Sequence, residues 1–357
     1  MKKVLITGIL GQDGANMAEY LLLKNDEPVK VYGMMRRSSI PNFTNIKKFR
    51  RHENFELVYG DLSDDVSIDN LVKKIQPDYF VNFAANSFVG CSWDMPEQVM
   101  DVNALGVLRC LESIRKFKLD CRFYSAGSSE EWGDVDYAPQ DIDHPIKPRS
   151  PYGASKASAR HLVKVYRESY GLYAVHGILF NHEGTKRGEE FVTRKITKGV
   201  ARIKKYLDDR ELAIETVEPI ELGNLEAKRD WSDSEDFVEG VWLMLNQDEP
   251  KNYILSSGEA HSIREFLNKA FKYAGISGSW VDVEGEPLKT KFMLNSDRPE
   301  PLVIINEKFY RPAEVDLLLG ESTPIRQELG WSPKVSFDRL VEKMVLFDIE
   351  LEKRKSD

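Results

Sequence analysis

The sequence contains few of the residues that build metal sites or disulfide frameworks. Its three cysteines form no CxxC pair, and its six histidines show no HxxxH or HExxH spacing. We therefore expect free thiols and no built-in metal site. No apolar run approaches the roughly 20 residues that a membrane span requires, and the first apolar run ends in glycines without a secretory cleavage site. The expected location is the cytoplasm, without a membrane partner.

An excess of positive charge is also missing. The formal net charge is −8 at pH 7. This charge argues against nonspecific binding to nucleic acid, because the phosphates of nucleic acid attract basic surfaces and repel acidic ones. Hydrophobic residues make up 41% of the 357 residues, and charged residues 30%. These are ordinary globular proportions, and a chain of this length favours about two domains.

Apolar, β-rich runs alternate with segments of helical spacing in the first half of the chain. The six runs are KVLITG, VKVYGMM, FELVYGD, YFVNFAA, CRFYSAG and YAVHGILF, and segments such as ANMAEYLLLKN and SIDNLVKKIQ lie between them. This alternation indicates βαβ units and a Rossmann-like, doubly wound parallel sheet of the α/β class. We predict a dinucleotide-binding domain over residues 1–180 and a smaller α/β substrate-binding lobe over residues 181–357. The two are interleaved, because segments around residues 225–258 are expected to return to the first domain.

Three glycines join the first expected strand to the first expected helix. Gly8, Gly11 and Gly14 follow KKVLIT and precede ANMAEYLLL. Glycine permits a positive φ and leaves no Cβ between backbone and ligand, while the start of the helix offers free N–H groups to phosphates. The spacing is GxxGxxG instead of GxGxxG, so its position in a strand-turn-helix unit carries the prediction of a dinucleotide site.

The end of the second expected strand indicates which nicotinamide cofactor is used. NAD sites commonly place an acidic residue there for the ribose 2′-hydroxyl, whereas this chain has Arg36 and Arg37. Guanidinium groups attract a 2′-phosphate, so we predict NADP. Asp61, after the third strand, is a candidate adenine contact. The predicted cofactor contacts are Gly8, Gly11, Gln12, Asp13, Gly14, Arg36, Arg37, Asp61, Leu62, Ala84, Tyr152 and Lys156.

A candidate catalytic group lies in SPYGASKASARHL. Tyr152 and Lys156 are four residues apart, which on a helix places them on one face. A phenol has a reference pKa of about 10, and a nearby ammonium favours the phenolate, so Tyr152 is a candidate base towards a sugar hydroxyl. Ser128, at the expected end of a strand, can hydrogen-bond the same hydroxyl. These residues indicate an oxidoreductase core of the short-chain dehydrogenase/reductase kind.

The chain resembles the GDP-mannose 4,6-dehydratases, within the extended short-chain dehydrogenase/reductase family, over nearly its full length. The resemblance rests on TGILGQDG, RRSS, DVNALGVLR, YRESYGLYAVHGILFNHEGTKRGEEFVTRKIT, LGNLEAKRDW and FYRPAEVDLLLGESTPIRQELGW. It implies oxidation of the hexose C4 hydroxyl by NADP, removal of the acidified C5 proton, loss of water from C6 and return of the hydride. Glu130 matches the acid/base position of the family. Dimers or tetramers are also implied.

The resemblance assigns further residues to the nucleotide-sugar substrate. Asn181 and Lys195 match positions towards the diphosphate, Arg187 and Arg229 match basic contacts to the nucleotide, and Glu314 matches a carboxylate facing guanine. Guanine presents N1–H and N2–H₂ donors that one carboxylate can accept together. The substrate-binding set is Asn181, Arg187, Val192, Lys195, Arg229 and Glu314, and His182 is left undecided.

Two segments depart from the family pattern and keep alternatives open. Glu131 and Trp132 follow Glu130 where the family usually has Leu-Tyr, and Asn86 and Phe88 replace residues of a run nearer Ala-Ala-Gln-Ser-His-Val. The alternatives are dehydration of a GDP-manno-heptose, a GDP-4-keto-6-deoxymannose reductase, which can carry a Ser-Ser-Glu-Glu run, and a noncatalytic nucleotide sensor. The complete set of Ser128, Glu130, Tyr152 and Lys156 disfavours the sensor.

Overall fold

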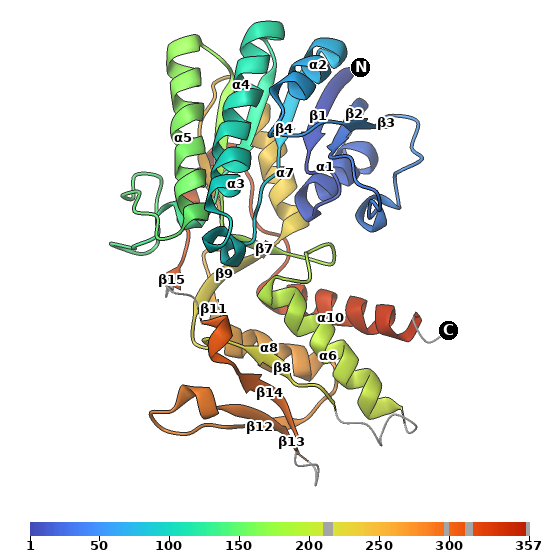
Figure 1. Ribbon diagram of the computed structural model, residues 1–357, viewed down its shortest axis with the longest axis vertical. Coiled ribbons are helices and arrows are strands. Elements are labelled where there is room, and N and C mark those ends of the chain that lie inside the picture. Colours follow the sequence, from blue (N-terminus) through green and yellow to red (C-terminus); the bar gives the residue numbers. More distant parts are fainter. Residues whose placement is uncertain (210–216, 296–299, 311–316, 355–357) are drawn as a thin grey trace.

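The computed structural model describes residues 1–209, 217–295, 300–310 and 317–354. A seven-stranded, fully parallel sheet dominates the upper part of the molecule in Figure 1. From edge to edge its strands are β10 (Tyr253–Leu255), β6 (Ala174–Leu179), β5 (Arg122–Ala126), β4 (Tyr79–Asn82), β1 (Lys2–Thr7), β2 (Val29–Met35) and β3 (Phe55–Tyr59). All six strands predicted from the first half of the chain lie in this sheet, which confirms the Rossmann-like fold.

Helices cover both faces of the sheet. One face packs against α1 (Gln12–Leu23) and α7 (Ser234–Leu245), and the other against α2 (Asp65–Ile75), α4 (Gly106–Phe117) and α5 (Pro151–Tyr170). Side chains alternate between these two cores as the strand pleat requires. Ile6 lies in the first core and its neighbour Leu5 in the second. Burial on both faces explains why the strands are apolar throughout.

The smaller lobe lies below the sheet in Figure 1. Its helices α6 (Val192–Asp208), α8 (Ile263–Tyr273) and α10 (Phe337–Arg354) share a core with one small sheet. That sheet contains β12 (Gly278–Val281), β13 (Lys291–Leu294), β14 (Pro301–Ile305) and β8 (Ile220–Leu222). A second small sheet contains β11 (Ala260–Ser262), β9 (Lys228–Asp233), β15 (Leu317–Leu318) and, beside β9, β7 (Asn181–Glu183).

Segments late in the chain return to the large sheet. Helix α7 covers one of its faces, β10 forms one of its edges, and α9 (Thr323–Leu329) packs beside β10. Two short helices, α3 (Pro96–Met100) and a π-helical turn over residues 101–105, precede α4. Among the described helices, none combines the length and apolar character required to cross a membrane. The described cysteines are all unpaired, as expected from their spacing.

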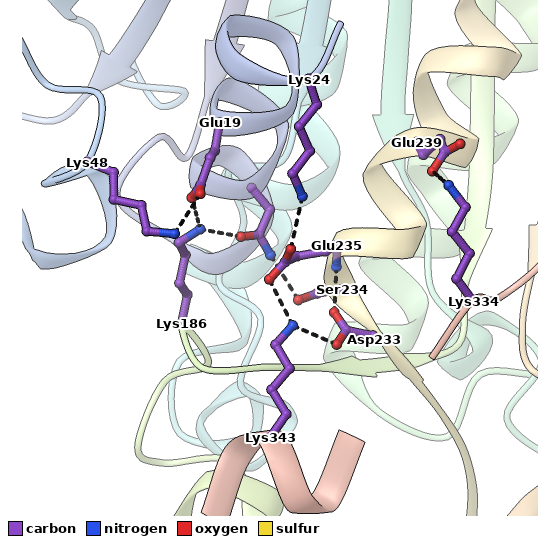
Figure 2. A network of polar contacts seen from close by, with 11 residues as sticks. Glu19, Lys24, Lys48, Lys186, Asp233, Ser234, Glu235, Glu239, Lys334 and Lys343 are labelled. Atoms are coloured by element: carbon purple, nitrogen blue, oxygen red, sulfur yellow. Dashed lines mark hydrogen bonds and ion pairs between the residues drawn. The ribbon is translucent and has the colours of Figure 1, made fainter. Parts of the chain in front are cut away.

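Charged contacts join the two lobes, as Figure 2 shows. On α10, Lys343 Nζ lies 2.8 Å from Asp233 Oδ2 and 2.8 Å from Glu235 Oε1 at the start of α7. On the loop after β7, Lys186 Nζ donates at 2.6 Å to Glu19 Oε2 on α1. Both contacts hold elements of the smaller lobe against helices that cover the large sheet. The candidate site lies in the space between the two lobes.

Candidate active site

A cleft of about 1810 Å³ opens between the lobes at the carboxyl edge of the large sheet. The strand order changes direction at β1, between β4 and β2, which is where open α/β sheets bind ligands. Apart from Arg37, every predicted site residue within the described parts of the chain lines this cleft. These are Gly8, Gly11, Gln12, Asp13, Gly14, Arg36, Asp61, Leu62, Ala84, Ser128, Glu130, Tyr152, Lys156, Asn181, Arg187, Val192, Lys195 and Arg229. Glu314 lies outside the described residues.

The glycine loop is packed too tightly for side chains. Gly8 has a φ of +67°, and the Gly11 N–H donates to the Gly8 carbonyl at 2.9 Å. A Cβ on Gly14 would lie 2.4 Å from the Gly8 oxygen. Gly11 is the N-cap residue of α1 and makes no side-chain hydrogen bond to the helix. The first backbone N–H groups of the helix therefore remain available to a ligand in the cleft. This arrangement suits a dinucleotide diphosphate.

A partly buried pair ties this loop to the second lobe. His182 Nε2 lies 3.1 Å from Asp13 Oδ2, and its Nδ1 lies 2.7 Å from the Phe180 carbonyl oxygen. Burial lowers the pKa of His182, but the carboxylate of Asp13 outweighs this effect and raises it above its ordinary value. His182, left undecided by the sequence, is thus a partner of the predicted cofactor residue Asp13. The two positions are far apart in the chain, so no spacing signal could have linked them.

The two arginines after β2 occupy different positions. Both are exposed, but Arg36 lines the cleft and Arg37 does not. Asp61 also lines the cleft, and its Oδ1 accepts hydrogen bonds from Ser63 N at 3.0 Å and Ser63 Oγ at 2.8 Å. The guanidinium of Arg36 therefore contributes a positive charge to the cleft wall.

The catalytic candidates meet where β5 ends and α5 begins. Ser128 caps a short 3₁₀ helix, η4 (Ser129–Glu131), and its Oγ accepts from Glu130 N at 3.2 Å. Ser150 caps α5 by accepting from Gly153 N at 3.0 Å, which places Tyr152 in the first helical turn. The side chains of Tyr152 and Ser128 are hydrogen-bonded. One substrate hydroxyl can therefore contact both groups.

Burial sets the acid–base properties of this pair differently from the sequence-based expectation. Burial raises the pKa of Tyr152 to about 12, although the hydrogen bond from Ser128 opposes this shift. Burial also lowers the pKa of Lys156 to about 8. Lys156 Nζ donates to the Ala126 carbonyl oxygen at 2.7 Å and lies 5.8 Å from the centre of the Tyr152 ring. In the protein alone, burial thus outweighs the stabilisation of the phenolate that we predicted from Lys156.

The two consecutive glutamates have different environments. Glu130 lines the cleft, and its charge contributes to the raised pKa of Tyr152. Glu131 has no exposed side-chain surface and contacts Ser128 N and His176 in the interior. Only Glu130 is therefore positioned to exchange a proton with a ligand in the cleft.

The residues predicted to bind substrate form the wall nearest the second lobe. Arg187 Nε lies 3.0 Å from Glu183 Oε2, and the guanidinium lies 3.5 Å from the centre of the Phe191 ring. Lys195 Nζ lies 3.4 Å from the centre of the Phe309 ring, and burial lowers the pKa of this lysine. The cations are thus held by aromatic faces while they line the cleft.

Two aromatic members of this wall, Phe191 and Phe309, were missed by the sequence reasoning. Phe191 and Phe309 line the cleft beside the predicted cations, and Phe88 packs edge-on against Phe191 with ring centres 5.9 Å apart. A phenylalanine has the same appearance in a sequence whether it fills a core or a cleft. The position of Phe191 four residues after Arg187 was the available signal.

Comparisons with known proteins agree with this geometry. A family model described as GDP-mannose 4,6 dehydratase matches residues 5–344. The chain belongs to this family. The human GDP-mannose 4,6 dehydratase is 42% identical over 356 residues, covering 97% of this chain and 91% of the relative. The Vibrio cholerae serotype O1 enzyme is 40% identical over 365 residues, covering 98% and 94%.

Solved structures of more distant dehydratases and related enzymes share the fold. A dTDP-glucose 4,6-dehydratase from Bacillus anthracis, in complex with NAD, aligns with a TM-score of 0.77 at 19% identity and covers 99% of this chain and 98% of its own. RMD from Pseudomonas aeruginosa, complexed with NADPH, aligns with a TM-score of 0.75 at 20% identity, covering 98% and 100%. GDP-mannose 4,6-dehydratase family membership and the Rossmann-like fold predicted from the sequence are both confirmed.

Proposed function

We propose that this protein converts GDP-mannose to GDP-4-keto-6-deoxymannose by NADP-dependent 4,6-dehydration. The observation that carries the proposal is that Ser128, Glu130 and Tyr152 line the same cleft as the glycine-rich start of α1. The curated relatives, which cover nearly all of this chain, carry the name of that activity. A simple hydride transfer would need no carboxylate beside the serine, and an elimination needs one.

The residues present fit a nicotinamide dinucleotide. Gly8, Gly11 and the uncapped start of α1 would hold the diphosphate, and Asp61 would face the adenine. Arg36 supports the choice of NADP, because a guanidinium pairs with a 2′-phosphate. When bound, the nicotinamide accepts a hydride from the substrate and returns it.

The protein side chains then supply the proton transfers. The positive charge of an oxidised nicotinamide, when bound, would lower the pKa of Tyr152, so that its phenolate can accept the proton of the C4 hydroxyl, and Ser128 orients that hydroxyl through a hydrogen bond. The C4 ketone acidifies the C5–H bond, so Glu130 can take the C5 proton and pass a proton to the departing C6 hydroxyl. Loss of that water leaves a double bond between C5 and C6. The product is completed when C5 takes up a proton that Glu130 obtains from solvent, balanced by the proton that Tyr152 releases, and C6 takes up the hydride that the bound nicotinamide would return.

On the substrate side, we infer that the cations of the second lobe bind the nucleotide diphosphate. Lys195 and Asn181 are assigned to the phosphates, and Arg187 and Arg229 to the nucleotide. Arg229 is almost fully buried, with Nη1 donating to the Lys228 carbonyl oxygen at 2.9 Å. Val192 contributes an apolar contact to the same wall. The role of Glu314 towards guanine is retained as part of this proposal from the family resemblance.

The proposal is tested by incubating the protein with NADP and GDP-mannose in deuterated water, followed by mass spectrometry. We expect a product that has lost one water and carries solvent deuterium at C5, with no net oxidation of added NADPH. Consumption of one NADPH per turnover of a 4-keto sugar would identify a reductase instead. Dehydration of a GDP-manno-heptose but not of GDP-mannose would overturn the hexose assignment.

We also propose that the chain forms a homo-oligomer in the cytoplasm. Large apolar side chains are exposed on α5, where Val165 is 49% exposed and Tyr170 is 50% exposed. A second copy is one partner that would cover such side chains. Light scattering coupled to size-exclusion chromatography measures the assembly directly, and a monomer at micromolar concentration would refute the proposal.

A further inference from the structure

Glu131 is a buried acid that the proposed reaction does not use. Its side chain has no exposed surface, and its Oε1 accepts the Ser128 backbone N–H at 2.8 Å. The same oxygen lies 2.8 Å from His176 Nε2 on β6, and Oε2 lies 3.7 Å from Arg160 Nη1 on α5. A buried acid requires such partners, since burial without them is costly.

These contacts support η4, the short helix that carries Glu130, from the interior of the protein. Burial lowers the pKa of His176 and so favours the neutral ring, which can bind the carboxylate by donating Nε2–H. The contact with Ser128 closes a capping box around η4, whose middle residue is Glu130. A Cβ at the neighbouring Gly127 would lie 2.3 Å from His176 Nε2, so the packing leaves the turn little freedom to move.

We propose that Glu131 is a positioning residue, which holds Ser128 and Glu130 in their reactive places through the Ser128 N–H and the buried partner His176. The inference rests on the proposed dehydratase function. Glu131 touches neither substrate nor cofactor, since it lies outside the residues that line the cleft. Its removal would leave the Ser128 N–H and the His176 ring without an acceptor, and the turn would be free to tilt.

The charge of Glu131 gives this role a distinctive pH signature. The charged and titratable groups that face it are His176 on β6, Arg160, Lys156 and Tyr152 on α5, and Tyr124 on β5. Its negative charge raises the pKa of Tyr152 and also that of Lys156. A neutral residue of the same shape would therefore let Tyr152 deprotonate at lower pH.

Two variants separate the hydrogen bond from the charge. Glu131→Gln keeps an oxygen for the Ser128 N–H, so we expect kcat for GDP-mannose within about fivefold of wild type. The rise of kcat/KM with pH should move to lower pH in this variant. Glu131→Leu removes the acceptor, and we expect kcat to fall by about tenfold or more with KM changed less than about threefold.

Asp236→Asn is the matched control. Asp236 is a buried carboxylate that also accepts backbone N–H groups, from Lys334 at 2.8 Å and Val335 at 3.0 Å, but it lies outside the cleft lining. We expect this variant to lose thermal stability while keeping the wild-type kcat and pH profile. Wild-type dehydration of GDP-mannose, measured in parallel, tests the proposed function separately from the role of Glu131.

The outcomes distinguish positioning from packing. If Glu131→Gln and Asp236→Asn lose similar thermal stability and both keep the wild-type kcat and pH profile, Glu131 is only a structural residue. The Glu131→Gln arm decides the question even if Glu131→Leu fails to fold. A shifted pH profile in Glu131→Gln, absent from Asp236→Asn, supports the proposal.

Discussion

Glu130 and Glu131 are neighbours in the chain, yet Glu130 lines the cleft while the side chain of Glu131 has no exposed surface. The 3₁₀ helix that contains both residues turns one towards the ligand space and the other into the protein. Of these two consecutive glutamates, Glu130 is thus a candidate acid/base and Glu131 is a buried hydrogen-bond acceptor. The predictions that follow separate the steps of the proposed reaction and the forces that hold its residues.

Glu130→Gln is expected to slow water elimination by about 100-fold or more, because positioned general acid–base groups contribute at least that factor. Hydride transfer from C4 should continue, since Tyr152 and Ser128 are untouched. Stopped-flow absorbance of the reduced nicotinamide should therefore show its accumulation with GDP-mannose. The control is Glu131→Gln, which should slow elimination far less. Similar elimination rates in the two variants would contradict the assignment.

Tyr152→Phe is expected to block the first oxidation. The variant keeps the aromatic ring but removes the hydroxyl that is hydrogen-bonded to Ser128. We expect the reduced nicotinamide to form about 100-fold more slowly, with GDP-mannose affinity within about threefold of wild type. Single-turnover absorbance measures the rate, and calorimetric titration measures the affinity. Normal reduction of the nicotinamide by this variant would exclude Tyr152 as the base.

Arg36→Ala is expected to weaken NADP binding by about tenfold or more while changing NAD binding little, because a charge-assisted hydrogen bond to the 2′-phosphate is lost. Arg37→Ala is the matched control, since Arg37 is exposed outside the cleft. Fluorescence titrations of both dinucleotides measure the ratio of affinities. Tighter binding of NAD than of NADP by the wild type would refute the cofactor prediction.

The large sheet was predictable because its signals are local. Each buried strand is an apolar run bounded by turn residues, and Ile6 and Leu5 face opposite cores within one such run. The glycine loop and the Tyr152–Lys156 spacing are also short patterns that need no tertiary information. The family resemblance singled out Glu130, which lines the cleft, and its catalytic role stays a prediction.

The remaining site residues depend on contacts that no local pattern encodes. His182 reaches Asp13 across the lobes, and the partner of Glu131 is His176 on a strand that pairs with β5. The sequence also predicted a phenolate favoured by Lys156, whereas burial dominates the pKa of Tyr152. The spacing of two residues on a helix indicates whether their side chains share a face. It does not indicate how deeply they are buried, and burial determines the desolvation of a charged group.

Lys156→Met is expected to stabilise the protein at pH 7 while abolishing activity. Burial lowers the pKa of Lys156 to about 8 from its ordinary value of 10.5, so below pH 8 the folded state bears the full cost of a buried ammonium. Between pH 8 and pH 10.5 the unfolded chain binds more protons than the folded protein. Over this range the stability of the wild type therefore rises with pH relative to that of the variant. Urea unfolding should show the advantage of Lys156→Met shrinking from pH 7 to pH 10. An advantage that grows over this range would contradict the assigned pKa shift.

Lys343→Met is expected to reduce the acid sensitivity of the contact between α10 and α7 (Figure 2). Burial raises the pKa of Glu235, but hydrogen bonding and charge from Lys343, with a smaller effect of Lys24, lower it to about 2 from its ordinary value of 4.5. The stabilisation is therefore present above pH 4.5 and is lost as the pH falls towards 2, because the unfolded chain takes up the proton first.

Without the Lys343 ammonium, the pKa of Glu235 should move back towards 4.5, so the slope of stability against pH between 4.5 and 2 should flatten. Asp233, whose side chain is fully buried, would also lose its cation, and the variant should be less stable than wild type at pH 7. Lys24→Met is the control, because Lys24 is 55% exposed and lies farther from Glu235, at 3.2 Å. Chemical unfolding at a series of pH values gives the slopes. Equal flattening in both variants would show that Lys343 has no special role in holding α10 against α7.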